Sequence, residues 1–343
     1  MVKNGENGAL NSLFPHAYES SFSNFYRYLR AKLPFVCNLE TAVSRICRAI
    51  SDKEIILVFG DYDVDGITAT TILYQFLAHA GANVDFHIPH RIEEGYGLRA
   101  EHITETADRI GANLIVTVDC GSASHEAVEL ANQAGIDVII TDHHDIDTLP
   151  QAAAVVNPKR DDCSSGLDHL AGVGVAFALL MHLRARLRET GFWGDTEEPN
   201  LKAACDLVAL GTVADIVPLV HENRVLTRVG LEMLNAAPRP GIQALIEVCG
   251  IRKPALEAED LAFRLGPRLN AAGRMDHARL AVELLTTGDP EEARRLSEHV
   301  NTLNSRRQSV ESQILRRIEM YLEQCPEMLE QKSLVLADPD WHQ

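Results

Sequence analysis

The chain has 343 residues, enough for about two domains and for a core that needs no disulfide staples, so small disulfide-rich scaffolds are excluded. Its 46% hydrophobic and 24% charged residues, with 22 glycines and 14 prolines, are near the globular average, which excludes mainly disordered and collagen-like chains. With 32 basic and 49 acidic residues the net charge is −17, so contact with nucleic acid would need local basic patches or bound cations.

Residues 1–40 form a predicted N-terminal extension. Its first residues, 1–14, are polar and lack the basic and apolar regions of a secretory signal. No stretch of the sequence approaches about 18 uninterrupted apolar residues, so no membrane association is expected. The 7 cysteines form no CxxC pair, which favours reduced thiols, argues against zinc-finger chemistry and predicts a cytoplasmic location.

Residues 41–172 alternate short apolar runs with helix-period segments that end at or near a glycine. Strands that are apolar on both faces and alternate with helices predict a parallel sheet with right-handed crossovers. This region is therefore predicted to be a doubly wound α/β domain. The predicted strands are 55–59, 84–88, 114–118, 138–141 and 154–156, and the predicted helices are 67–80, 100–110 and 124–134.

Residues 173–288 change to a helical pattern, with apolar faces over 173–188, 200–211, 225–234 and 242–249. The stretch 289–325 is polar, rich in arginine and free of glycine, and it predicts one long connecting helix about 50 Å in length at 1.5 Å per residue. Residues 333–337 resemble a strand, so 333–343 are interpreted as the start of a second domain.

Acidic residues and histidines follow three of the predicted strands, where ligands bind in open parallel sheets. Carboxylates gathered there cannot all stay ionised without cations between them, and a mixed carboxylate and imidazole set suits Mn²⁺ or Mg²⁺. Asp215 is a lone carboxylate in an apolar run, which predicts that it completes the metal site. The residues at the strand ends are Asp61, Asp63 and Asp65 after the first, Asp119 after the third, and Asp142, His143, His144 and Asp145 after the fourth.

Simpler explanations exist for parts of this pattern. An EF-hand loop beginning at Asp61 would need a glutamate where Ile72 stands, so a calcium loop is not expected. One of the three aspartates after the first strand is expected to cap the following helix. Cys120 is expected to serve packing, because its acidic surroundings disfavour a thiolate. A pair of hard cations without a side-chain nucleophile is suited to activating water, which predicts phosphoester or phosphoanhydride hydrolysis.

Four segments together resemble the motifs of the DHH phosphoesterase superfamily in order and spacing: 61–66 (DYDVDG), 118–121 (VDCG), 141–144 (TDHH) and 211–215 (GTVAD). Two further segments, 263–276 (FRLGPRLNAAGRMD) and 90–97 (HRIEEGYG), are similar to RecJ-type exonucleases specific for single-stranded DNA. The resemblance runs from about residue 39 to the last residue.

The resemblance implies 5′ to 3′ degradation of single-stranded DNA to 5′-mononucleotides in DNA repair and recombination, with Mn²⁺ or Mg²⁺ in a two-metal site. It also implies helicase or single-strand-binding protein partners, and leaves the oligomeric state open. Carried over by residue, Asp142 orients a histidine and His144 donates to the scissile phosphate. The implied metal ligands are Asp63, Asp65, Asp119, His143 and Asp215, and Asp119 is implied to bridge the two metals. Asp61 is either a further ligand or a hydrogen-bond acceptor behind the ligands.

Four arginines within sixteen residues supply the basic patch that the acidic total requires, and Arg279 among them is interpreted as a salt-bridged helix face. Arg268 and Arg274 lie in a segment that looks like a turn, so they are predicted to clamp phosphates with the help of Asn270. Arg91 and Tyr96 are candidates to contact the 5′ phosphate or to stack on a base. The equal alternative is that Arg91 lies at the rim of the site and that Tyr96 packs in the core.

RecJ-type proteins continue past the connecting helix into a second domain and an OB-fold. This sequence is therefore expected to be a fragment that binds metal but acts weakly on DNA. Two other functions stay open: a phosphoesterase acting on short oligonucleotides or cyclic dinucleotides, and a non-catalytic replication scaffold with a decayed centre.

Overall fold

The computed structural model describes residues 22–194, 196–236, 238–338 and 341, so most of the predicted N-terminal extension lies outside the described residues. Its centre is a parallel sheet with the strand order β2-β1-β3-β4-β5. The strands are β1 (Ile55–Gly60), β2 (Asn83–His87), β3 (Leu114–Val118), β4 (Asp137–Thr141) and β5 (Ala154–Val156). The predicted doubly wound α/β fold is confirmed, and every predicted strand of the domain is present.

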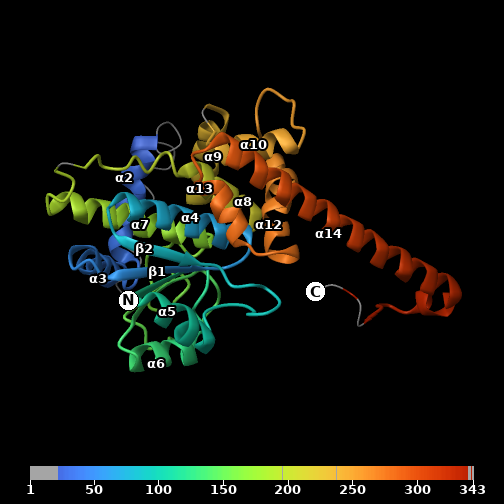
Figure 1. Cartoon of the computed structure of the whole chain (residues 1–343), viewed down its shortest axis with the longest axis horizontal. Coiled ribbons are helices and arrows are strands. Elements are labelled where there is room, and N and C mark those ends of the chain that lie inside the picture. The colour runs from blue at the N-terminus through green and yellow to red at the C-terminus, as the bar shows by residue number, and fades with distance from the viewer. Residues whose placement is uncertain (1–21, 195, 237, 339–340, 342–343) are drawn as a thin grey trace, which may run out of the picture.

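The two faces of the sheet pack into two separate hydrophobic clusters, because side chains alternate along each strand. Ile56 and Val58 of β1 join the larger cluster, whereas Leu57 and Phe59 join the smaller one. The helices α4 and α7 lie on one side of the sheet and α5 and α6 on the other (Figure 1). The helices of the domain are α3 (Leu39–Ser51), α4 (Val64–His79), the π-helical η2 (His102–Ala107), α5 (Asp108–Ile110), α6 (His125–Gln133) and α7 (Gly172–Glu189).

The remaining helices follow α7, apart from α2 (Phe22–Lys32) and η1 (Leu33–Phe35), which precede the sheet. They are α8 (Cys205–Ala214), α9 (His221–Ala236), α10 (Pro240–Val248), α11 (Ala258–Asp260), π-helical η3 (Leu261–Leu265), α12 (Gly266–Met275), α13 (Arg279–Thr286), α14 (Pro290–Gln324) and η4 (Pro326–Glu330). Within the described ranges, every helix is too short or too polar to cross a bilayer.

The helix α14 has 35 residues, which confirms the predicted long helix, and its role as a connection between domains stays a prediction. Its buried residues all lie between Ala293 and Asn304, and beyond them the helix projects away from the body (Figure 1). Three details of the prediction are wrong. Residues 201–204 form turns before α8, the segment 266–275 is a helix and not a turn, and residues 333–338 have no strand partner and form no strand.

Candidate metal centre

The loop after β1 supplies three aspartates, and each has a different environment. Asp63 caps α4, because its Oδ1 accepts a hydrogen bond from the Gly66 N–H at 3.0 Å. Asp61 accepts from the N–H of Tyr62 at 2.7 Å and is buried. The expectation that one of the three aspartates acts as a helix cap is therefore confirmed, and the cap bond uses the Oδ1 atom of Asp63.

Asp65 is held by the N-terminus of α7. Its two carboxylate oxygens accept hydrogen bonds from the N–H groups of Gly172 at 2.6 Å and Val173 at 2.8 Å. The absence of a side chain at Gly172 is required, since a Cβ there would lie 2.3 Å from Oδ1 of Asp119. The start of α7 therefore places the carboxylates of Asp65 and Asp119 next to one another.

His143, after β4, lies among three carboxylates from separate parts of the chain. Its Nε2 is 3.1 Å from Asp119 Oδ1, 3.8 Å from Asp65 Oδ2 and 3.7 Å from Asp215 Oδ2. Asp119 follows β3 with a φ of 61°, and Asp215 ends α8. The structure thus brings together the aspartates and the histidine that were predicted from separate strand ends.

Two of these buried atoms, Asp119 Oδ1 and His143 Nε2, make no hydrogen bond within the described residues. Such atoms are costly to bury unless they have a partner. The ligand atoms of Asp65, His143 and Asp215 lie within 4.8 Å of one another, and so do those of Asp61, Asp63 and Asp119. The two groups meet at the His143–Asp119 contact. The donor set fits hard divalent cations.

The electrostatics of the cluster also favour cations. Burial, with Asp63 nearby, raises the pKa of Asp61 to about 8 and that of Asp215 to about 6. Burial and neighbouring aspartates raise the pKa values of Asp65 and Asp119 well above the usual range. Burial lowers the pKa of His143 to about 4, so this ring is neutral at pH 7 and its nitrogen is available to a metal.

Asp142 and His144 form a separate pair beside the cluster. His144 Nδ1 lies 2.8 Å from Asp142 Oδ1. Burial raises the pKa of Asp142, but hydrogen bonds from His144 and Ser122 outweigh it and lower that pKa to about 2. The hydrogen bond to Asp142 raises the pKa of His144 despite burial. The pair therefore favours the protonated form of this imidazole and holds the ring in one orientation beside the predicted metal ligands.

The residues that were predicted to contact phosphate have different partners in the structure. Arg268 donates from Nε to Asn301 Oδ1 and from Nη1 to the Arg264 carbonyl, both at 2.8 Å. Asn270 accepts from the Val64 N–H at 3.1 Å, so it joins α12 to the loop of predicted metal ligands. Both side chains are used within the fold, and their predicted contacts with phosphate stay predictions. Arg279 pairs with Glu283 at 3.0 Å, which confirms its interpretation as a salt-bridged helix face.

Arg274, in contrast, lies in a cationic group. Burial and the nearby charges of Arg91 and Arg307 lower the pKa of Arg274, with Asp63 acting in the opposite direction. The guanidinium of Arg91 lies 5.0 Å from the ring centre of Tyr62. Arg307 comes from α14 and was missed by the sequence interpretation, because nothing in a long polar helix shows which arginine faces the site.

A cavity of about 560 Å³ adjoins the Asp142–His144 pair. Tyr96 lines it and lies with its hydroxyl 3.3 Å from His144 Nδ1. Ser122, Ser124 and His125 line its other side. Cys120 is fully buried, and burial raises the pKa of its thiol, which agrees with the expected packing role.

Comparison with known proteins gives consistent matches. The family model described as DHH family, N-terminal domain, matches residues 55–212. A single-stranded-DNA-specific exonuclease RecJ from Dickeya dadantii is 44% identical over 326 residues, which are 92% of this chain and 56% of that protein. The protein of the same name from Escherichia coli is 42% identical over 347 residues, 97% of this chain and 59% of that protein. The chain thus spans less than two thirds of the length of these curated relatives.

Solved structures agree with the sequence matches. A crystal structure of exonuclease RecJ bound to manganese has a TM-score of 0.76 and 38% identity, and the match covers 90% of this chain and 74% of that one. A Thermus thermophilus RecJ in complex with Mn²⁺ has a TM-score of 0.72 and 34% identity, covering 90% of this chain and 43% of that one. The same fold therefore holds manganese in two related crystal structures.

Proposed function

Because this chain belongs to the RecJ branch of the DHH family, we propose that it is a metal-dependent exonuclease acting on single-stranded DNA. The observation that carries the proposal is the meeting of Asp65, Asp119, His143 and Asp215 at one buried point. A decayed scaffold would not need Asp119 Oδ1 and His143 Nε2 buried without a hydrogen bond, because burying such atoms costs free energy.

The cations that fit this site are Mn²⁺ and Mg²⁺, and the related crystal structures contain both. The residues that would hold them are Asp61, Asp63, Asp65, Asp119, His143 and Asp215. When bound, divalent ions of this kind lower the pKa of water and stabilise charge on a phosphodiester. The side chains of the protein fix the positions of the ligands and exclude bulk water from the buried carboxylates.

His144 is suited to donate a hydrogen bond to the scissile phosphate. Its Nδ1 faces Asp142, and the raised pKa favours a protonated ring, in which Nε2 is a second donor. Asp142 in turn accepts from the N–H groups of Ser122 at 2.9 Å and His143 at 2.7 Å. The carboxylate therefore cannot rotate freely, and the imidazole is fixed before the substrate binds.

The group formed by Arg91, Arg274 and Arg307 supports the choice of a phosphate backbone as substrate. The charges of Arg91 and Arg307 both disfavour the charge of Arg274, and an anion bound beside Arg274 would relieve this repulsion. Asp63 acts on Arg274 in the opposite direction, so this arginine lies near one of the proposed metal ligands. Guanidinium groups bind phosphate through paired hydrogen bonds, which makes them suitable to hold a DNA strand.

The finer parts of the proposal follow from the family. We propose 5′ to 3′ polarity, release of 5′-mononucleotides, a role in DNA repair and recombination, and a cytoplasmic location. Helicase and single-strand-binding protein partners belong to the same proposal.

The test is hydrolysis of labelled oligonucleotides by the purified chain in Mn²⁺. We expect single-stranded DNA carrying a 5′ phosphate to be shortened from that end, duplex DNA to resist, and Asp119→Asn to be inactive. Short strands are included because they need fewer contacts along the DNA. Equal rates on cyclic dinucleotides and on single strands would favour the small-substrate phosphoesterase, and binding of DNA without turnover in any metal would favour the scaffold.

A further inference from the structure

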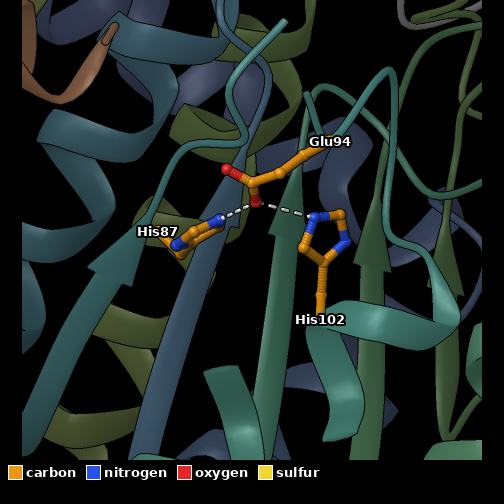
Figure 2. Close-up of side chains that lie close together, drawn as sticks. All are labelled: His87, Glu94 and His102. Atoms are coloured by element: carbon orange, nitrogen blue, oxygen red, sulfur yellow. Dashed lines mark hydrogen bonds and ion pairs between the residues drawn. The ribbon is translucent and has the colours of Figure 1, made fainter. Parts of the chain in front are cut away.

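A second cluster of histidines and a carboxylate lies outside the metal centre, in the segment that follows β2. Glu94 lies between two imidazole rings (Figure 2), with its Oε2 2.8 Å from Nε2 of His87 and 3.0 Å from Nε2 of His102. We call these three residues the Glu94 clamp. No part of the mechanism above uses it.

The hydrogen bonds of the clamp identify it as a closed network. The Arg99 N–H donates to Nδ1 of His102 at 2.9 Å, so the proton of this ring is on Nε2 and is donated to Glu94. Burial and His87 lower the pKa of His102, in agreement with a neutral ring. The other oxygen of Glu94 accepts from the His90 N–H at 2.8 Å. The clamp therefore differs from the metal centre, where Asp119 Oδ1 and His143 Nε2 make no hydrogen bond within the described residues.

The clamp fixes the turn that carries Arg91. Glu94 closes this turn twice, because its side chain accepts from the His90 N–H and its own N–H donates to the His90 carbonyl at 2.8 Å. Arg91 lies inside the closed turn, with its guanidinium over the Tyr62 ring. The carbonyl of Glu94 also accepts from Arg99 Nη1 at 3.1 Å, so the other end of the segment is tied to the same residue.

Tyr96 follows the clamp between two glycines in the left-handed region, Gly95 with a φ of 80° and Gly97 with a φ of 76°. Only glycine adopts these conformations at no cost, so the course of the chain after Glu94 is specific. It brings the Tyr96 hydroxyl to 3.3 Å from Nδ1 of His144. The carboxylate of Glu94 thus closes the turn that carries Arg91 and lies two residues before Tyr96.

The clamp is also attached to the strand that delivers the metal ligands. The ring of Phe59 is fully buried and stacks on His87 with centres 5.5 Å apart, and it contacts His102 at 4.8 Å. Phe59 is near the end of β1, directly before Gly60 and Asp61. The distance between the clamp and the metal ligands is therefore set by a short piece of rigid strand.

We propose that Glu94 is a positioning residue for the phosphate at the end of the DNA strand: it holds Arg91 and Tyr96 at a fixed place relative to the metal ligands. The proposal rests on the proposed nuclease function. Glu94 touches neither the metal ligands nor the expected position of the scissile bond, so its effect is on how a strand end is held.

The test compares Glu94→Gln with Glu93→Gln. The first variant keeps the shape of the side chain, but an amide cannot accept from two rings and a backbone N–H as a carboxylate does. The second removes the same charge from the neighbouring residue, whose side chain is 80% exposed. Each variant is assayed on short single strands with a 5′ phosphate and with a 5′ hydroxyl, and its Mn²⁺ affinity is measured by calorimetry.

For Glu94→Gln we expect KM on the 5′-phosphorylated strand to rise by about tenfold, the equivalent of one misplaced charged hydrogen bond. We expect kcat, Mn²⁺ affinity and the KM for the 5′-hydroxyl strand to change little, and Glu93→Gln to resemble the unsubstituted chain. An equal loss on both strands, or a loss in kcat alone, would show that Glu94 only supports the fold and would overturn the proposal. No change at all would overturn it too.

Two further measurements separate this proposal from its premise. If the unsubstituted chain cleaves neither strand, the nuclease proposal fails, but the effect of Glu94→Gln on the affinity for a 5′-phosphorylated strand is still measured by fluorescence anisotropy in Ca²⁺. Titration with Zn²⁺ examines whether the clamp is a metal site. Binding that survives Asp119→Asn but is lost in Glu94→Gln would make the clamp a metal site and refute its role as a closed network.

Discussion

Removal of divalent cations is predicted to make the stability of the protein fall as the pH rises from 6.5 to 8. Asp61 is the best-defined group, because burial and Asp63 raise its pKa from 3.8 to about 8 in the folded chain. The folded state then keeps a proton that the unfolded state has already released. Stability from such a group is complete below the unfolded pKa and is lost as the pH rises toward the folded pKa.

The size of the effect follows from the proton count. When the folded state binds one proton more than the unfolded state over 1.5 pH units, the free energy of unfolding falls by ~2 kcal/mol, since each pH unit corresponds to about 1.4 kcal/mol. Asp65 and Asp119 act in the same direction, because burial raises their pKa values too. His143 acts in the opposite direction only below pH 6.5, where the unfolded ring takes up a proton. His144, with its raised pKa, adds to the loss both with and without metal.

The assay is thermal unfolding at pH 6.5 and pH 8, with chelator and with Mn²⁺. His144 contributes both with and without metal, so subtracting the Tm in chelator from the Tm in Mn²⁺ at each pH removes its contribution. We expect the gain in Tm from Mn²⁺ to be larger at pH 8 than at pH 6.5 by several degrees. The metal-free protein loses ~2 kcal/mol of stability between these pH values, and each kcal/mol shifts the Tm of a large domain by about 2 °C or more. An equal gain at both pH values, or a chelated protein that becomes more stable as the pH rises, would refute this account of the carboxylate cluster.

Three other variants test separate contacts. Gly172→Ala should lower Mn²⁺ affinity by tenfold or more because its Cβ displaces Asp119, whereas Gly174→Ala, whose Cβ meets only the Leu170 side chain, should bind normally by calorimetry. Asn270→Ala should lower the free energy of unfolding in urea by about 1 to 2 kcal/mol through the lost bond to Val64, and an unchanged stability with weaker DNA binding would restore its predicted role in phosphate contact. Asp142→Asn should move the high-pH limb of the rate profile downward, because His144 loses the carboxylate that raises its pKa; an unmoved limb would contradict that assignment.

The sheet and much of the site could be predicted because their signals are local. Strands such as 114–118 are apolar on both faces, and the carboxyl ends of parallel strands share one edge of the sheet. That topology alone predicts that groups after β1, β3 and β4 meet. Asp215 could be found because a carboxylate in an apolar run needs a partner.

Other features depend on contacts between distant segments and were missed or misjudged. The glycines and the asparagine near Arg268 and Arg274 suggested a turn, but α12 begins at Gly266 with a proline in its first turn, where proline is allowed. Residues 333–337 have the composition of a strand, yet a strand needs a neighbour to pair with, and none is present in the described chain. Glu94 lies in the 90–97 segment, but its contacts could not be predicted, because its partners come from a strand end and from a π-helical turn.

The central claim is that two divalent ions share this cluster of carboxylates around His143. Anomalous diffraction at the manganese edge from crystals grown in Mn²⁺ tests it most directly. The account predicts two peaks, one among Asp65, His143 and Asp215 and the other among Asp61, Asp63 and Asp119. A map with no peak there, or with its only peak at the Glu94 clamp, would contradict it.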